Sequence, residues 1–157
     1  FYEQYTFFTI GMNLRPTDLQ SFIGLDQLKY LDNSIKYRFE LIKKIQEILA
    51  NTTVSTFSNP KMDIISAFAI PIIFKSLKDK SLGLDLFAEA GVEVRPLISG
   101  NILNQPFSKN HLNFKSEDYP NSELVHKLGL YFTCRPDLNE YEEKVIFEVL
   151  NKIKTKI

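Results

Sequence analysis

The stretch Gly11-Met-Asn-Leu-Arg-Pro-Thr-Asp-Leu-Gln20 marks the point where an extended segment runs into a long helix. Thr17 and Gln20 have the spacing of a capping box, with Thr17 at the N-cap and the glutamine side chain reaching back to it. Arg15 precedes a proline and is therefore expected to be extended. Asn13 and Arg15 thus lie on a loop beside a helix N-terminus, which suits an anion such as phosphate. An ordinary helix start with a surface arginine explains the same residues.

A long amphipathic helix is predicted at about residues 18–49. Its apolar residues recur at steps of three and four, as one face of a helix requires. The set comprises Leu19, Phe22, Ile23, Leu28, Leu31, Ile35, Phe39, Ile42, Ile45 and Leu49. We expect a bend near Asp32-Asn33.

The rest of the chain predicts a strand–helix–strand unit at 66–98, a loop at 99–119 and a helix–strand–helix unit at 121–157. In the first unit Pro71 cannot donate a ladder hydrogen bond, so we expect its strand to lie at an edge or to break there. Its helix, at 82–90, is expected to end at Gly91. The last helix is expected to begin at Asn139, with Glu142 completing a second capping box.

This order of elements predicts one α/β domain over residues 1–157. A small antiparallel or mixed sheet, covered mainly on one face by helices, satisfies the pattern. A chain of 157 residues is long enough for one domain with a core and short for two.

Composition excludes several classes of function. The 19 basic and 19 acidic side chains cancel, so no basic excess predicts binding to nucleic acid. No apolar run is long enough for a transmembrane helix. The single cysteine, Cys134, excludes an internal disulfide and fits a reducing, cytoplasmic compartment. Because the chain begins with Phe1 and not with methionine, we expect it to be a fragment of a longer protein.

Few residues suggest chemistry on their own. His111 and His126 are interpreted as surface or capping residues, Cys134 as a buried small hydrophobe, and no cluster has metal-ligand spacing. Ser99-Gly100-Asn101 follows a strand end and offers a hydroxyl, an amide and backbone N–H groups to a ligand, with a glycine that permits close approach. Arg95 is placed to aim its guanidinium at an anion or a carbonyl. A simple turn and a structural salt bridge are the alternatives.

Three stretches resemble the DegT-type family of pyridoxal-phosphate (PLP) enzymes, which aminate or 3-deoxygenate nucleotide-linked keto sugars. They are Gly11–Leu31, the run Gly91-Val-Glu-Val-Arg-Pro-Leu-Ile-Ser-Gly-Asn-Ile-Leu-Asn-Gln-Pro106, and Arg135–Glu143. They occur in the family's order and span nearly the whole chain. The resemblance implies the smaller, C-terminal domain of a fold-type I PLP enzyme, acting as a homodimer in lipopolysaccharide or deoxysugar biosynthesis.

The same resemblance implies roles for individual residues. Asn13 would reach the PLP phosphate in the partner subunit's active site, and Arg15 would lie near the phosphates of the nucleotide sugar. The sugar side of the pocket would be lined by Arg95, Ser99, Asn101 and Gln105. The Arg-Pro…Gly-Asn…Gln-Pro version is more similar to the 3-dehydratase branch than to the aminotransferase branch.

The chain also departs from the family pattern. Met12 stands where many members have tyrosine, and Asn104 where an arginine is common, which removes a charge. The half that carries the catalytic lysine, or a histidine in dehydratases, has no counterpart. Since the lysines at 61, 75, 78 and 80 do not match the Schiff-base motif, the chain alone is predicted to have no catalytic residue and no covalently bound PLP. A stand-alone, non-catalytic binding or structural module derived from this fold is the alternative.

Overall fold

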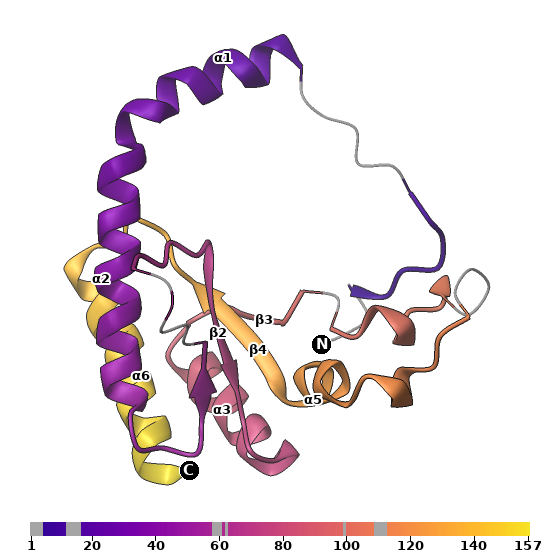
Figure 1. The fold of residues 1–157 in the computed structure, drawn as a ribbon. Coiled ribbons are helices and arrows are strands. Elements are labelled where there is room, and N and C mark those ends of the chain that lie inside the picture. Colours follow the sequence, from indigo (N-terminus) through magenta and orange to yellow (C-terminus); the bar gives the residue numbers. More distant parts are fainter. Residues whose placement is uncertain (1–4, 12–16, 58–60, 62, 99, 109–112) are drawn as a thin grey trace.

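The computed structural model describes residues 5–11, 17–57, 61, 63–98, 100–108 and 113–157. Within them the chain forms a four-stranded antiparallel sheet of order β1-β2-β4-β3. The strands are β1 (Ser55–Thr56), β2 (Ala69–Ile73), β3 (Val94–Pro96) and β4 (Gly129–Thr133). The helices that supply core residues are α2 (Leu31–Leu49), α3 (Leu77–Glu89) and α6 (Glu140–Lys156). Figure 1 shows α2 and α6 side by side along the sheet.

One face of the sheet carries the core. Ile70 and Ile72 of β2 and Leu130 and Phe132 of β4 are at most 1% exposed, whereas the residues between them are only half-buried. Because successive strand residues point to opposite faces, the helices cover the face of Ile72 and Phe132. The opposite face, called the open face here, carries Tyr131. The prediction of a sheet covered mainly on one face is confirmed, and the sheet is antiparallel.

The helix predicted at about 18–49 is interrupted. It consists of α1 (Asp18–Gln27) and α2, joined by a 3₁₀ turn at Leu28–Tyr30, so the bend comes just before the predicted Asp32-Asn33. The capping box is present: the Thr17 N–H donates to Gln20 Oε1 (2.8 Å), and the Gln20 N–H donates to Thr17 Oγ1 (3.4 Å). Whereas the apolar stripe of α2 packs against the core, α1 points away from it and buries none of its residues (Figure 1).

Pro71 neither lies in an edge strand nor breaks its strand, so that expectation was wrong: β2 is continuous from Ala69 to Ile73 and lies between β1 and β4. The physical reason is the shortness of β1, which pairs only with Ile72 and Ile73. The Pro71 carbonyl faces β1 and accepts a hydrogen bond from Thr56 Oγ1 (2.8 Å). Its nitrogen points the same way, past the end of the β1 pairing, so the missing N–H interrupts no ladder hydrogen bond.

Helix α3 differs from the prediction at its start and agrees with it at its end. Helix α3 begins at Leu77, earlier than expected, because the Ser76 hydroxyl caps it by accepting from the Asp79 N–H (3.1 Å). It ends as expected at Gly91 (φ 69°), where the Val92 N–H bonds to the Phe87 carbonyl (2.9 Å) in a Schellman motif.

Two further helices were predicted close to their observed positions. Helix α5 (Pro120–Leu128) begins with proline at its first position, one residue before the predicted start at 121. Helix α6 begins after Asn139 with the predicted capping box to Glu142. Among the described helices, none combines the length and apolarity needed to cross a bilayer.

Candidate functional site

The candidate site consists of three segments brought together at one end of the sheet. They are the strand β3, the loop that follows it (residues 97–108, called the β3 loop) and the N-terminal segment (residues 5–11). In Figure 1 the N-terminal segment runs beside the β3 loop, which in turn lies against α5. Sequence positions nearly one hundred residues apart therefore meet here.

Arg95 supplies a cation on the open face of the sheet. It pairs across the ladder with Tyr131, and residues paired in this way present their side chains on the same face. Its Nε donates to Glu93 Oε1 (2.8 Å), and the side chain is about half exposed. The hydrogen bond to Glu93, with Tyr5 and Tyr131 nearby, raises the pKa of Arg95. The guanidinium thus stays charged and accessible, as contact with an anion requires.

Asn101 is committed to the shape of the β3 loop. It is 3% exposed and caps the 3₁₀ turn Ile102–Asn104, its Oδ1 accepting from the Leu103 N–H (3.1 Å). Its Nδ2 donates to Glu123 Oε2 on α5 (3.2 Å). Both ends of this amide therefore contact the chain itself, and its predicted contact with a sugar stays a prediction.

Glu123 fixes the β3 loop to α5. Besides Asn101, it accepts from Asn104 Nδ2 (2.7 Å) and pairs with Lys127 Nζ (3.1 Å). The hydrogen bond from Asn104 is the largest cause of a lowered pKa of Glu123. Sequence reasoning missed Glu123, because its spacing to Lys127 indicates only an ordinary helical pair. The Asn104 side chain contributes to the shape of the loop through this contact.

Gln105 joins the β3 loop to the N-terminal segment. The residue is 6% exposed, its Oε1 accepts from the Phe7 N–H (2.8 Å), and its Nε2 donates to the Tyr5 carbonyl (2.9 Å). Two residues on, the Phe107 N–H donates to the Phe7 carbonyl (3.2 Å). The two segments are thus bonded side by side.

Other predicted site residues lie outside the described residues. They are Asn13, Arg15 and Ser99, together with His111 and Met12. The roles that the family resemblance gives to Asn13, Arg15 and Ser99 stay predictions.

Cys134 and His126 lie in the packed part of the molecule. Cys134 is fully buried, as predicted, and burial raises the pKa of its thiol to about 11, which leaves it protonated and inert at neutral pH. His126 is half-buried in the last turn of α5 and lies against Gly100, so it is not a surface residue; the alternative, a capping residue, stays a prediction.

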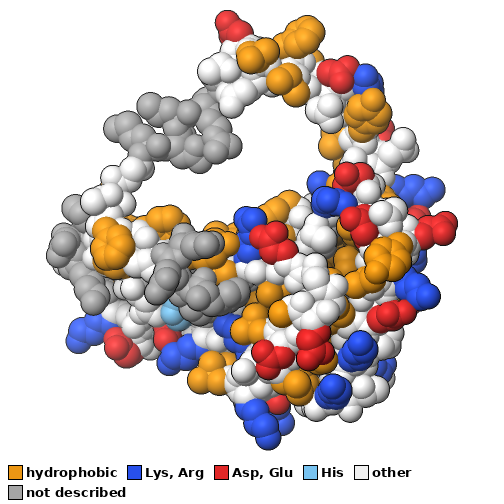
Figure 2. All heavy atoms as spheres, turned by 180° about the vertical axis from the view of Figure 1, so that it is seen from behind, with side chains coloured by type: hydrophobic (Ala, Val, Ile, Leu, Met, Phe, Trp, Pro, Cys, Tyr) orange, Lys and Arg blue, Asp and Glu red, His pale blue; other side chains and the backbone are white. Residues whose placement is uncertain are grey.

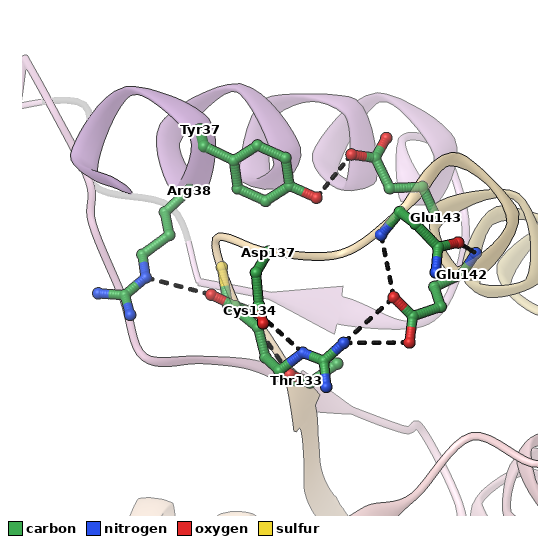
Figure 3. A network of polar contacts seen from close by, with 9 residues as sticks. Tyr37, Arg38, Thr133, Cys134, Asp137, Glu142 and Glu143 are labelled. Carbon is green, nitrogen blue, oxygen red and sulfur yellow. Dashed lines mark hydrogen bonds and ion pairs between the residues drawn. The ribbon is translucent and has the colours of Figure 1, made fainter. Parts of the chain in front are cut away.

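The third family-like stretch, from Arg135 to Glu143, forms a polar network at the end of β4 (Figure 3). Arg135 Nη2 contacts both carboxylate oxygens of Glu142 (3.0 and 3.1 Å), and its Nε pairs with Asp137 (3.1 Å). On the α2 side, the Tyr37 hydroxyl donates to Glu143 (2.6 Å), which raises the pKa of Tyr37 further above the value that burial gives it. These contacts tie α2 and α6 to β4, a structural role.

The match to known families decides the affiliation. Residues 1–151 match the model of the DegT/DnrJ/EryC1/StrS aminotransferase family. The chain belongs to this family. The matched residues include the three segments that make up the candidate site, namely β3, the β3 loop and the N-terminal segment.

Curated relatives within the DegT/DnrJ/EryC1/StrS family are dehydratases of a nucleotide sugar. The GDP-4-keto-6-deoxy-D-mannose 3-dehydratase of Yersinia pseudotuberculosis is 29% identical over 97% of this chain and 39% of its own length. The enzyme of the same name from Escherichia coli O55:H7 is 28% identical over 83% of this chain and 34% of its own. The chain thus spans less than two fifths of the length of these relatives.

Solved structures of the family share the fold. The E. coli GDP-4-keto-6-deoxy-D-mannose-3-dehydratase with bound hydrated PLP superposes with a TM-score of 0.72 at 21% identity, covering 97% of this chain and 39% of that one. An aminotransferase of the family from Brucella abortus gives a TM-score of 0.68 at 17% identity, covering 94% and 38%. The predicted α/β fold of a PLP enzyme is therefore confirmed.

Proposed function

We propose that this chain is the C-terminal part of a PLP-dependent, cytoplasmic enzyme that aminates or 3-deoxygenates a nucleotide-linked keto-deoxy sugar. The observation that carries the proposal is the family match over residues 1–151. Both curated relatives named above are 3-dehydratases of a GDP-linked sugar, and this chain covers only 39% and 34% of their lengths. A C-terminal domain of a larger enzyme accounts for both facts.

In this proposal the β3 loop and the open face form the sugar side of the pocket. Arg95 contributes an exposed guanidinium that suits a phosphate or a sugar carbonyl. Ser99 contributes a hydroxyl from the same loop. Asn101 and Gln105 are buried with their amides bonded to the chain, so they act by holding the loop in shape next to the sugar.

The lysines of the described chain support only a non-covalent role toward PLP. When bound, PLP acts as an electron sink, and the protein has to supply a residue that can reach its aldehyde. Lys80 is 5% exposed, but its Nζ donates to the Lys127 carbonyl at the end of α5 (2.8 Å). The other described lysines are exposed. We therefore propose that this chain contributes Asn13 to the PLP phosphate, and that the Schiff-base residue lies elsewhere in the enzyme.

The surface of α1 supports assembly into a homodimer. Figure 2 shows apolar side chains gathered along α1, which stands away from the rest of the molecule. Leu19, Phe22, Leu25 and Leu28 are 60–73% exposed. A continuous apolar surface of this kind usually marks a contact with another protein surface. We propose that the surface is covered in the dimer, where the residues just ahead of α1, Asn13 and Arg15, reach the partner's active site.

The experiment that tests the proposal is to sequence the coding DNA upstream of Phe1. A frame that continues into a PLP-binding half supports it, and a lysine or a histidine at the Schiff-base position then separates aminotransferase from dehydratase. The purified protein encoded by the whole frame should show a PLP absorption band. A protein without that band contradicts the proposal.

The alternative is a stand-alone, non-catalytic module. The commitment of Lys80 to a backbone carbonyl favours it. Gel filtration with light scattering on the 157-residue chain discriminates: a soluble monomer supports the module, whereas self-association through the exposed α1 surface supports the enzyme domain.

A further inference from the structure

We propose that Gln105 is a positioning residue. Its side-chain amide fixes the N-terminal segment to the β3 loop and thereby sets the position of the chain that leads to Asn13 and Arg15. The consequence for PLP binding rests on the proposed function, whereas the anchoring itself does not. Gln105 acts through the segment that it holds and touches no reacting atom.

The Gln105 side chain forms hydrogen bonds with the backbone of the N-terminal segment, as a neighbouring β-strand would. One amide group accepts from the Phe7 N–H (2.8 Å) and donates to the Tyr5 carbonyl (2.9 Å), which satisfies backbone groups on both sides of Thr6. The backbone contact from Phe107 to Phe7 continues the pairing. Because Gln105 is 6% exposed, water has little access to its amide in this arrangement. If either hydrogen bond of the Gln105 amide is lost, a buried polar group is left with a weaker hydrogen-bond partner.

The platform that carries Gln105 is itself fixed. Its backbone N–H donates to the Ile102 carbonyl (3.1 Å), and its carbonyl accepts from the Ser108 hydroxyl (2.7 Å). Ser108 is 2% exposed and also bonds the Leu103 carbonyl (2.7 Å). Glu123 then fastens this loop to α5 through Asn101 and Asn104. The loop that carries Gln105 is therefore held against helix α5.

The described residues that precede and follow Asn13 and Arg15 in sequence are both held in place. On one side stands Phe7, bound to Gln105; on the other stands Thr17, fixed in the capping box of α1. Residues held at both ends lose less conformational freedom when a ligand binds. If one end is released, this conformational freedom is lost only when the ligand binds. The affinity for the ligand is then weaker.

The first test measures hydrogen exchange of single backbone amides in the 157-residue chain, with NMR as the readout. The Gln105→Leu variant keeps most of the volume and removes both bonds, so the Phe7 and Phe107 amides should exchange roughly tenfold faster. Gln105→Glu keeps the acceptor for the Phe7 N–H and should give an intermediate rate. Asn151→Leu is the matched control: Asn151 is an exposed amide on α6 that bonds only a nearby carbonyl in the described structure, and its loss should leave both rates unchanged. Unchanged core amides, such as that of Ile72, show that the variants fold.

Two results overturn the proposal. The first is a Phe7 amide that exchanges equally fast in wild type, Gln105→Leu and Gln105→Glu. The second comes from the protein encoded by the whole frame: there Gln105→Leu should weaken PLP affinity about tenfold while Asn151→Leu does not, and equal affinities contradict positioning. A wild-type protein that binds no PLP overturns the proposed function instead, and the exchange data then still decide whether Gln105 anchors the segment.

Discussion

A methyl group placed on Gly100 would lie 2.1 Å from Nδ1 of His126. The β3 loop therefore approaches α5 so closely that the His126 ring occupies the space of a side chain. Gly100 also has a φ of 64°, a backbone conformation that other residues adopt at a cost. The positive φ and the close approach of His126 are two independent reasons why the β3 loop requires glycine at position 100.

Replacement of Gly100 by alanine should destabilise the protein by about 2–4 kcal/mol. The left-handed conformation accounts for about 1–2 kcal/mol and the overlap with His126 for the rest. Urea unfolding followed by circular dichroism measures the change. Gly24→Ala is the control: Gly24 lies within α1 with no atom near its added methyl group, so that variant should be as stable as wild type or more stable. Equal effects of the two substitutions would show that the contact with His126 is unimportant.

Gly83 permits α3 to pack on the end of β2. A methyl group there would lie 2.4 Å from Cζ of Phe74, a core residue that is 2% exposed. Gly83→Ala should lower stability by about 1–3 kcal/mol, because the ring has little room to move. A thermal melt measures it. The double variant Gly83→Ala/Phe74→Leu should lose less than the sum of the two single variants, and strict additivity would contradict a direct clash.

Removal of the Glu123 carboxylate should loosen the β3 loop. Glu123→Ala leaves the buried amide of Asn101 without its acceptor, at a cost of about 1–3 kcal/mol. Asn104→Ala removes one exposed donor to the same carboxylate and should cost less. Limited proteolysis within residues 97–108 reports the loosening directly. Cleavage that is equally slow in Glu123→Ala and wild type would rule out this role for Glu123.

Stability should fall at alkaline pH because of Cys134. Its pKa is about 11 in the folded protein against an ordinary 9.0, so the folded state holds its proton more tightly than the unfolded chain. The resulting stability is fully present below pH 9 and is lost as the pH rises toward 11, by up to about 3 kcal/mol.

The Cys134→Ala variant isolates this effect. Its free energy of unfolding, measured under reducing conditions from pH 8 to 10.5, should fall less steeply than that of wild type. The raised pKa of Tyr37 acts in the same direction at higher pH, so Tyr37→Phe serves as a second comparison that changes the profile mainly above pH 10. Parallel profiles of wild type and Cys134→Ala would contradict the assignment.

The predictable parts of this structure are those whose partners are neighbours in sequence. The capping boxes at Thr17 and Asn139 and the glycine stop at Gly91 each involve atoms within one or two helical turns, so their spacing indicates them. The family resemblance pointed to the β3 loop. By contrast, the contacts of Gln105 with the N-terminal segment depend on where distant segments meet, and no local pattern encodes that. The same reason explains the missed strand β1 and the interior position of Pro71.

The place of β4 in the sheet has a consequence for how the protein is made. β4 lies between β2 and β3 and pairs with both, yet it follows both in sequence. During translation from the N-terminus, β2 and β3 emerge first and have no hydrogen-bonding partner in common until Thr133 has left the ribosome. The apolar residues of β2 and β3 are covered only after this central strand has been made, so we expect the sheet to assemble once β4 has emerged and to be most prone to aggregation just before that point.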